Sequence, residues 1–294
     1  MAKLDRLGWA AGLAINAYGV RVGIRVNRAD ALERVLPRLP PAWKPAASPL
    51  VDRLYSLICG GGGSGLTVRR FSLLYGDAAR LVRTMDPDQA FGRLESDLKL
   101  FVAQASGRRV FVHAGVVGWR RRAIVIPGRT LSGKSTLVAA LVRAGATYYS
   151  DEFAMLDRRG RVHPFAIPLS LREHGPLAPA TKHPVEALGG RAGVGALPVG
   201  LVIVTRFRPE ARWRPRPLSA GEGVLALLAH TLPARARPVQ VLMTLRQAVS
   251  GAAVLKGPRG EAQEATASIL ESVPAAQGEG RGLGRRPRPA AAMR

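Results

Sequence analysis

The sequence predicts an α/β protein, and three observations lead to this fold class. Alternating or continuously apolar runs that are typical of strands recur along the chain, with segments of helical spacing between them. A glycine-rich phosphate-binding pattern in the second half follows an apolar run and precedes a helical segment. A chain of 294 residues can form two units that each bury a core. We therefore expect a smaller α/β N-terminal domain over residues 1–106, a nucleotide-binding domain over residues 107–274 and a disordered basic tail over residues 275–294.

The first domain shows strand and helix patterns in turn. Residues 20–26 alternate apolar and polar side chains, which predicts a half-buried strand. Residues 31–36 have helical spacing, and the prolines that follow stop this helix. A glycine-rich run at residues 60–65 predicts a long loop inside the domain, and residues 68–75 predict a second strand. Residues 88–106 carry apolar side chains at helical intervals and predict an amphipathic helix.

The second domain combines apolar strands with a turn that favours antiparallel pairing. We expect its strands at residues 110–117, 123–126 and 199–205. A helix is expected over residues 137–144, with Gly145 at its C-terminal cap. The segment 153–163 turns at an Asp-Arg-Arg-Gly sequence and predicts a hairpin. The sheet is therefore expected to be mixed rather than all-parallel.

The composition excludes several classes of protein. The single cysteine, Cys59, excludes a disulfide framework and a cysteine-based zinc cluster. No apolar stretch reaches the roughly 18 residues that indicate a membrane span. The first ten residues carry an aspartate and no long apolar run, unlike a signal peptide. We therefore expect a cytoplasmic protein without a membrane partner.

The formal net charge of +24 has two interpretations. Only six of the 44 basic residues are lysine, and an arginine-rich composition with abundant alanine, glycine and proline is typical of a GC-rich coding sequence. The other interpretation is affinity for a polyanion such as nucleic acid. The basic residues are spread along the chain and aromatic residues are only 5%, so no base-stacking platform is indicated.

A phosphate-binding loop (P-loop) pattern is the most specific motif in the sequence. It has the form Gly-x-x-x-x-Gly-Lys-Ser between a strand and a helix, the context in which the pattern is informative. The glycines let backbone amides approach phosphate oxygens, Lys134 would bridge the β- and γ-phosphates, and Ser135 would bind magnesium through its hydroxyl. The segment, called here the 128–136 loop, consists of Gly128, Arg129, Thr130, Leu131, Ser132, Gly133, Lys134, Ser135 and Thr136.

Two adjacent carboxylates follow the helix of this loop. A phosphate loop needs a second acid for magnesium or for the proton of the acceptor. Asp151 and Glu152 are the nearest candidates, and in extended chain they point to opposite sides. The alternative interpretation is an ordinary solvated turn.

The order of His113, the 128–136 loop and the acidic pair resembles the catalytic domain of HPr kinase/phosphorylase, a bacterial protein serine kinase. His113 precedes Gly128 by 15 residues and Asp151 follows it by 23, the intervals of the family pattern. The resemblance covers residues 108–175. It implies a P-loop domain with a mixed sheet of the HPr kinase/PEP carboxykinase type, and assembly into a homo-oligomer.

The resemblance also implies roles for single residues. Lys134 and Ser135 would hold ATP and Mg²⁺, Asp151 would be the general base, and His113 would lie beside the phosphates. Glu152 stands at the second aspartate of the family pair and is a candidate magnesium ligand together with Ser135.

One family signature departs from the pattern in this chain. The family has a Glu-Ile-Arg-Gly segment that is tied to magnesium and to the phosphorylase reaction. Here Arg172 matches its arginine, Ser170 stands at its glutamate, and Glu173 is the carboxylate that could substitute from a shifted position. This departure weakens the case for a phosphorylase reaction and for HPr as the substrate.

Taken together, these patterns predict an ATP-dependent, magnesium-requiring kinase. The acceptor would be a hydroxyl group of a protein, a peptide or a small molecule, and the first domain would select the acceptor or mediate oligomerisation. Two alternatives stay open: a nucleotide-binding regulator without turnover, which the altered residue 170 favours, and a nucleic-acid-binding protein, which the charge suggests.

Overall fold

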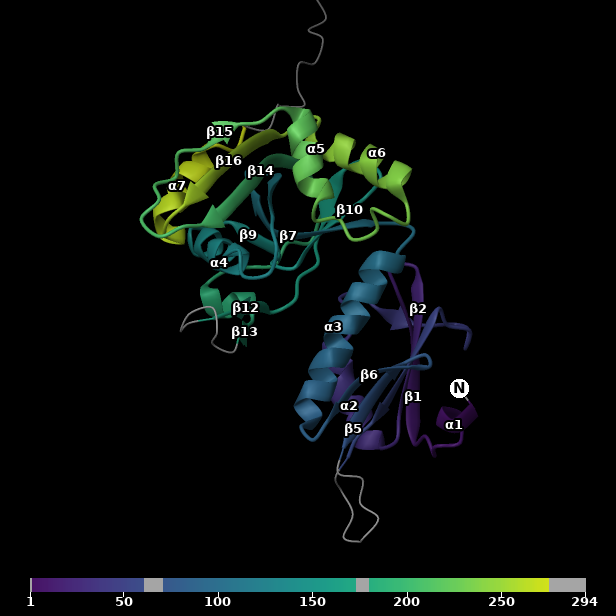
Figure 1. Cartoon of the computed structure of the whole chain (residues 1–294). Coiled ribbons are helices and arrows are strands. Elements are labelled where there is room, and N and C mark those ends of the chain that lie inside the picture. The colour runs from purple at the N-terminus through teal and green to yellow at the C-terminus, as the bar shows by residue number, and fades with distance from the viewer. Residues whose placement is uncertain (1, 61–70, 173–179, 275–294) are drawn as a thin grey trace, which may run out of the picture.

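The computed structural model describes residues 2–60, 71–172 and 180–274 (Figure 1). It contains two large sheets with helices packed on them, and each large sheet has both parallel and antiparallel neighbours. The expected α/β class is therefore confirmed. The predicted loop at residues 60–65 extends beyond the described residues after Gly60, and the predicted tail lies wholly outside them.

The first sheet has six strands in the order β3-β1-β2-β4-β5-β6. Strands β2 and β4 are parallel, and the other neighbours are antiparallel. The strands are β1 (Ala11–Ala17), β2 (Val20–Val26), β3 (Lys44–Pro45), β4 (Arg53–Ile58), β5 (Ser72–Gly76) and β6 (Ala79–Thr84). The helices of this part are α1 (Ala2–Asp5), α2 (Ala29–Val35), the 3-10 turn η1 (Leu36–Arg38) and α3 (Pro87–Ala105).

Helix α3 completes the core of this first part. Its side chains Phe91, Leu94 and Leu98 recur at helical spacing and are buried with the strand residues Ile24 and Leu57. The helix begins where the Asp86 side chain accepts a hydrogen bond from the Asp88 amide, with a proline at the first helical position.

The second sheet has eight strands, and the 128–136 loop follows one of them. Strand β14 is parallel to β8 and to β16, whereas β7 is antiparallel to β8, β9 and β10. The strands are β7 (Val110–Trp119), β8 (Arg122–Pro127), β9 (Thr147–Ser150), β10 (Phe153–Leu156), β11 (Arg161–His163), β14 (Leu197–Phe207), β15 (Arg216–Pro217) and β16 (Ala253–Arg259). A separate pair joins β12 (Leu169–Leu171) to β13 (Thr181–His183), and the 3-10 turn η2 (Val185–Leu188) follows.

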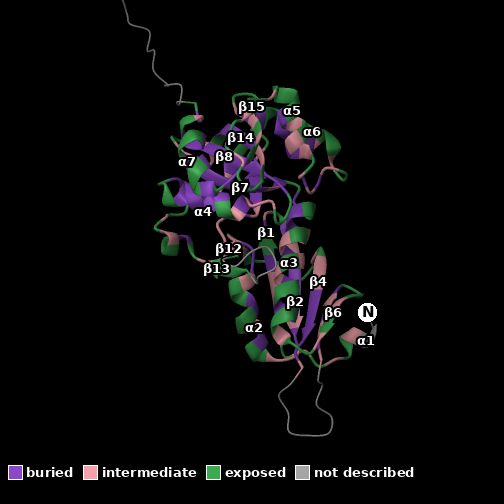
Figure 2. Ribbon diagram, turned by 60° about the vertical axis from the view of Figure 1, so that its left-hand side comes forward, coloured by how far each residue is buried: buried purple, intermediate pink, exposed green. Residues whose placement is uncertain are grey.

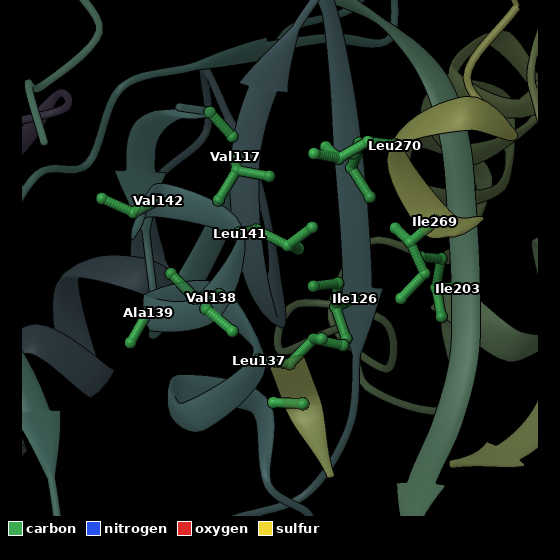
Figure 3. Close-up of a cluster of buried hydrophobic side chains, with 14 of the residues drawn as sticks. Val117, Ile126, Leu137, Val138, Ala139, Leu141, Val142, Ile203, Ile269 and Leu270 are labelled. Carbon is green, nitrogen blue, oxygen red and sulfur yellow. The ribbon is translucent and has the colours of Figure 1, made fainter. Parts of the chain in front are cut away.

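Helices cover both faces of this sheet because successive apolar side chains of its strands point to opposite faces, and both sets must be buried. Helices α4 (Lys134–Arg143) and α7 (Ala262–Glu271) pack on the face that carries Ile124 and Ile126, as Figure 3 shows for Ile126. Helices α5 (Ala220–Leu228) and α6 (Pro238–Val249) pack on the face that carries Val125. Figure 2 shows the resulting buried centre in the strands of this sheet and in α4. Strand β8, which leads into the 128–136 loop, is thus buried on both faces of the sheet.

An aromatic cluster joins the two sheets. Tyr18, in the turn between β1 and β2, packs edge-on against Phe111 of β7 with ring centroids 5.6 Å apart. Phe153 and Phe165 complete the cluster. The buried Ser106 hydroxyl donates to the Tyr18 carbonyl oxygen at 2.9 Å. The end of α3 is thereby fixed to the β1–β2 turn, and the Tyr18 ring of that turn packs on the second sheet.

Most predicted elements lie close to the observed ones. The strand over residues 20–26 and the hairpin over residues 153–163 are confirmed as β2 and as β10–β11. The helix expected to begin at residue 137 begins at Lys134, because the loop runs directly into it. The strand expected over residues 68–75 is observed from Ser72, and residues 68–70 lie outside the described part. The sequence patterns do not indicate the strands β1, β3, β4, β6, β9, β12, β13, β15 and β16 or the helices α1, α5, α6 and α7.

Within the described residues, no helix has both the length and the apolar character that a bilayer crossing requires.

Candidate functional site

The 128–136 loop connects β8 to α4 and turns on a glycine. Gly133 precedes the helix with φ of +83°, a conformation that side-chain-bearing residues rarely adopt. At Gly128 a Cβ atom would lie 2.7 Å from Ser132 Oγ, so the loop closes tightly on this residue. Leu131 has φ of +67° and is exposed. The two pattern glycines are therefore required by the shape of the loop.

Lys134 is the first residue of α4 and is almost completely buried, with 7% of its surface exposed. Its Nζ donates to the Arg129 carbonyl oxygen at 2.7 Å, across the curve of the loop. Burial lowers the pKa of Lys134 to about 8, against the opposing charges of Asp151 and Glu152. The ammonium is therefore held inside the loop, where it faces whatever the loop binds.

Asp151 follows β9 and lies directly against the start of α4. Ser135 Oγ donates to Asp151 Oδ2 at 3.1 Å. The Tyr148 hydroxyl donates to Asp151 Oδ1 at 3.1 Å, and the Ser170 amide donates to Oδ2 at 3.1 Å. Three donors from three elements fix the orientation of this carboxylate.

Glu152 points to a different partner from its neighbour. Its Oε2 lies 2.6 Å from Nζ of Lys99, which belongs to α3. Burial raises the pKa of the Glu152 carboxyl group, and Lys99 opposes this shift. The acid that contacts Ser135 is thus Asp151, whereas Glu152 faces the helix of the first sheet.

His113 lies on β7 behind the loop. Its carbonyl oxygen accepts a hydrogen bond from the Gly128 amide at 3.3 Å, which ties the strand to the first residue of the loop. Burial lowers the pKa of His113 to about 4, and the nearby charges of Lys134 and His230 act in the same direction. The imidazole is therefore neutral at pH 7.

Arg259, which no sequence pattern indicates, contacts the backbone of the loop. This residue ends β16 and is 2% exposed. Its Nη2 donates to the Gly133 carbonyl oxygen at 2.7 Å, and its Nη1 donates to the Gly260 carbonyl oxygen at 2.9 Å. Burial lowers the pKa of the Arg259 guanidinium. The signal in the sequence was an arginine at the end of a short apolar run, which is weak in a chain so rich in arginine.

These residues meet in one cavity of about 820 Å³. That volume is within the range of about 300–1,000 Å³ that is typical of small-molecule sites. The wall opposite the loop comes from α3, including Lys99. The lining residues that the sequence analysis had selected are His113, Thr130, Leu131, Gly133, Lys134, Ser135, Thr136, Asp151, Glu152, Ser170 and Arg172.

The remaining candidates have separate positions. Arg129 contributes its carbonyl oxygen to Lys134, and Ser132 Oγ is buried with no hydrogen-bond partner among the described residues. Glu173 lies outside the described residues. No group of three or more His, Cys, Asp or Glu side chains in the described part of the chain could hold a metal ion without further ligands.

No protein-family model matches this chain, and no curated protein matches it either.

Proposed function

We propose that this protein is an ATP-dependent, magnesium-requiring kinase with a P-loop fold of the HPr kinase type. The observation that carries the proposal is the convergence of Lys134, Ser135 and Asp151 at the start of α4, inside one cavity. The acceptor in this proposal is a hydroxyl group of a protein, a peptide or a small molecule.

Polar atoms left without partners fit a phosphate group in the loop. Ser132 Oγ and Arg259 Nε are buried and have no hydrogen-bond partner among the described residues. Hydroxyl and guanidinium groups donate hydrogen bonds to phosphate oxygens. The first turn of α4 adds amide N–H groups and the positive end of the helix dipole. A triphosphate therefore satisfies groups that the protein itself does not.

Ser135 and Asp151 together fit a magnesium ion. Both would supply oxygen ligands, which Mg²⁺ prefers, and the ion would neutralise charge on the phosphate oxygens. Their oxygens are 3.1 Å apart. Glu152, the expected partner of Ser135 at the ion, is bonded to Lys99. Asp151 takes that place in the proposal through Oδ2, the oxygen that faces Ser135, and its Oδ1 is the oxygen left for the proton of the acceptor.

The residues around the cavity have distinct tasks in the proposed reaction. Bound ATP supplies a γ-phosphorus to which the acceptor oxygen bonds while the bond to ADP breaks. Lys134 neutralises the charge of the phosphate oxygens, and the neutral imidazole of His113 keeps one N–H that can donate to them. Asp151, the carboxylate nearest the loop, receives the proton of the acceptor hydroxyl.

The topology around the loop supports the fold assignment. The loop follows β8, which has the parallel β14 on one side and the antiparallel β7 on the other. The β10–β11 hairpin adds further antiparallel strands. This is the mixed sheet that the resemblance implies.

Nucleotide binding and phosphate transfer test the proposal. Calorimetry with Mg²⁺ and ATP should give binding that Lys134→Ala weakens at least about tenfold, a loss of 1.4 kcal/mol. The matched control is Lys44→Ala on the exposed strand β3. Lysate from source cells that lack this gene should then gain a product labelled from γ-labelled ATP with wild-type protein and not with Asp151→Asn. Protein that binds no ATP, or binds it equally after Lys134→Ala, would refute the proposal.

The two alternatives give different results in the same assays. A regulator without turnover binds ATP and labels nothing. A nucleic-acid-binding protein binds DNA or RNA with an affinity that persists at about 0.15 M salt, and its affinity falls steeply as salt rises.

A further inference from the structure

Helix α3 has a second face that does not belong to the core of its own sheet. Phe91, Leu94 and Leu98 pack on the first sheet. Residues three or four apart on another side of the same helix line the cavity instead. This stripe consists of Asp88, Gly92, Glu95, Ser96 and Lys99. The first part of the chain thus supplies one wall of the site that holds the 128–136 loop, as the position of α3 beneath the second sheet in Figure 1 illustrates.

The last residue of this stripe holds one member of the acidic pair. Lys99 Nζ lies 2.6 Å from Glu152 Oε2 and 3.6 Å from Glu95 Oε1. The Lys99 side chain is 12% exposed, so it is largely withdrawn from water between two carboxylates. Removal of one member of such a pair leaves an uncompensated charge in a poorly solvated place. Lys99 therefore restricts where the Glu152 carboxylate can lie.

Further contacts connect Glu95 back to the acidic pair. With Lys99 they form a closed ring of Glu152, Lys99, Glu95, Lys182, Ser170 and Asp151. Lys182 of β13 donates to both carboxylate oxygens of Glu95, at 2.6 and 2.7 Å. Lys182 stands opposite Ser170 in the register of β12 and β13. The Ser170 amide donates to Asp151, which precedes Glu152 in the chain. The ring therefore passes through three separate parts of the fold and returns to the acidic pair.

We propose that Lys99 is a positioning residue of the site, which holds Glu152 and, through the ring, Asp151 in the place where the acceptor hydroxyl reacts. This inference rests on the proposed function. It gives the first part of the chain a direct part in the reaction, in addition to any selection of the acceptor. Lys134 and the glycines of the loop lie outside the ring, so ATP binding in the absence of Mg²⁺ is expected to be independent of it.

The test separates turnover from binding in the full chain. The variants are Lys99→Met, which removes the charge, and Lys99→Arg, which keeps it. The readouts are ATP affinity in EDTA, the kcat of phosphate release from ATP with Mg²⁺ and with water as acceptor, and the midpoint of thermal unfolding. Because small displacements of a reacting group cost large factors in rate, kcat should fall about tenfold or more in Lys99→Met while the Kd for ATP stays within about twofold. Lys99→Arg should recover to within about threefold of the wild-type kcat.

Two further variants complete the test: one at Lys182, where a smaller effect is expected, and one at Lys44, which is the control. Lys182→Met breaks the ring at its exposed end, where Lys182 is 53% exposed, and kcat should fall by only about threefold. Lys44→Met removes an exposed lysine of β3 and should leave kcat unchanged. Wild-type kcat in Lys99→Met overturns the inference. An equal loss of ATP affinity and kcat in Lys99→Met also overturns the inference, because Lys99 would then stabilise the whole cavity and not only the positions of Asp151 and Glu152.

A mutant cycle keeps the inference testable if the proposed function itself fails. Wild-type protein that binds no ATP, or that neither releases phosphate nor labels a product in the lysate, refutes the proposed function. The unfolding equilibrium of Lys99→Met, Glu152→Gln and the double variant then decides whether the pair is coupled. A coupling of about fivefold or more in the unfolding constant supports the pairing, and additive effects overturn it.

Discussion

Ser135 and Asp151 are joined by a hydrogen bond between side chains that stand 16 residues apart, from Ser135 Oγ to Asp151 Oδ2 at 3.1 Å. One side chain comes from the first turn of α4 and the other from the end of β9. This hydrogen bond connects the start of α4 to the residue that follows β9. The contact ties the most specific motif of the sequence to its acidic pair.

Replacement of the Ser135 hydroxyl should remove the effect of magnesium on ATP binding. In Ser135→Ala, the gain in ATP affinity that Mg²⁺ provides should shrink about tenfold, a loss of 1.4 kcal/mol, because the ion loses an oxygen ligand. The affinity for ATP in EDTA should stay unchanged. Calorimetric titrations with and without EDTA measure both quantities. Ser96→Ala, on the opposite wall of the cavity, is the control. Equal losses in both titrations would contradict the assignment.

Tyr148→Phe should destabilise the protein without altering its shape. The hydroxyl oxygen lies 3.1 Å from Asp151 Oδ1 and 2.8 Å from the Ile167 carbonyl oxygen, two acceptors that share its single hydrogen, and burial raises the Tyr148 pKa so that the donor stays protonated. Both acceptors lose this donor in the variant. The free energy of unfolding should fall by about 1–2 kcal/mol in urea titrations. Tyr75→Phe on the first sheet should change it little, and an equal effect in both variants would speak against the prediction.

His113 should make the stability of the protein depend on pH below neutrality. Burial lowers its pKa to about 4 in the folded state, whereas the unfolded chain titrates near about 6.5. The unfolded state therefore takes up the proton first as the pH falls. The stability that His113 contributes is complete above about pH 6.5 and is lost as the pH falls toward about 4.

Urea titrations of wild type and His113→Gln between pH 7 and pH 5 measure this contribution. The wild-type protein should lose more unfolding free energy over that interval than the variant, which has no imidazole at this position. Parallel pH profiles for the two proteins would show that residue 113 does not titrate as its burial implies.

Gly92→Ala should stabilise the chain. Gly92 lies in the interior of α3, and a Cβ at this position would meet nothing within 4 Å. An alanine there gains helix propensity of up to about 1 kcal/mol and encounters no steric conflict. Gly128→Ala provides the contrast, because its Cβ would lie 2.7 Å from Ser132 Oγ. A lower urea midpoint for Gly92→Ala than for wild type would disprove the prediction.

The parts of the fold that local patterns determine could be predicted from the sequence. Alternation identified β2, and the cap glycine Gly145, with φ of +96°, ends α4 as expected. Strand β1 was missed because its small residues alternate weakly, and it becomes a strand through pairing with β2 along its full length. Helices α5, α6 and α7 show the same limit, since their apolar faces are recognisable only once the sheet they cover is known.

The candidate site divides in the same way. The loop and the acidic pair are close in sequence, so spacing alone brought them together. Lys99 and Arg259 come from elements far along the chain, and no local pattern relates them to the loop. The different directions of Asp151 and Glu152 were anticipated from extended geometry, but the partner of Glu152 depends on where α3 lies.

The packing of Tyr18 against Phe111 limits how modular this protein can be. A cut between residues 106 and 107 would separate the two sheets, yet it would expose an aromatic surface on both pieces. A graft of residues 107–274 onto another N-terminal partner would lack the wall of the cavity that α3 supplies. The two parts are therefore expected to be inherited and engineered together, and a substitution at Tyr18 is expected to require a compensating substitution at Phe111.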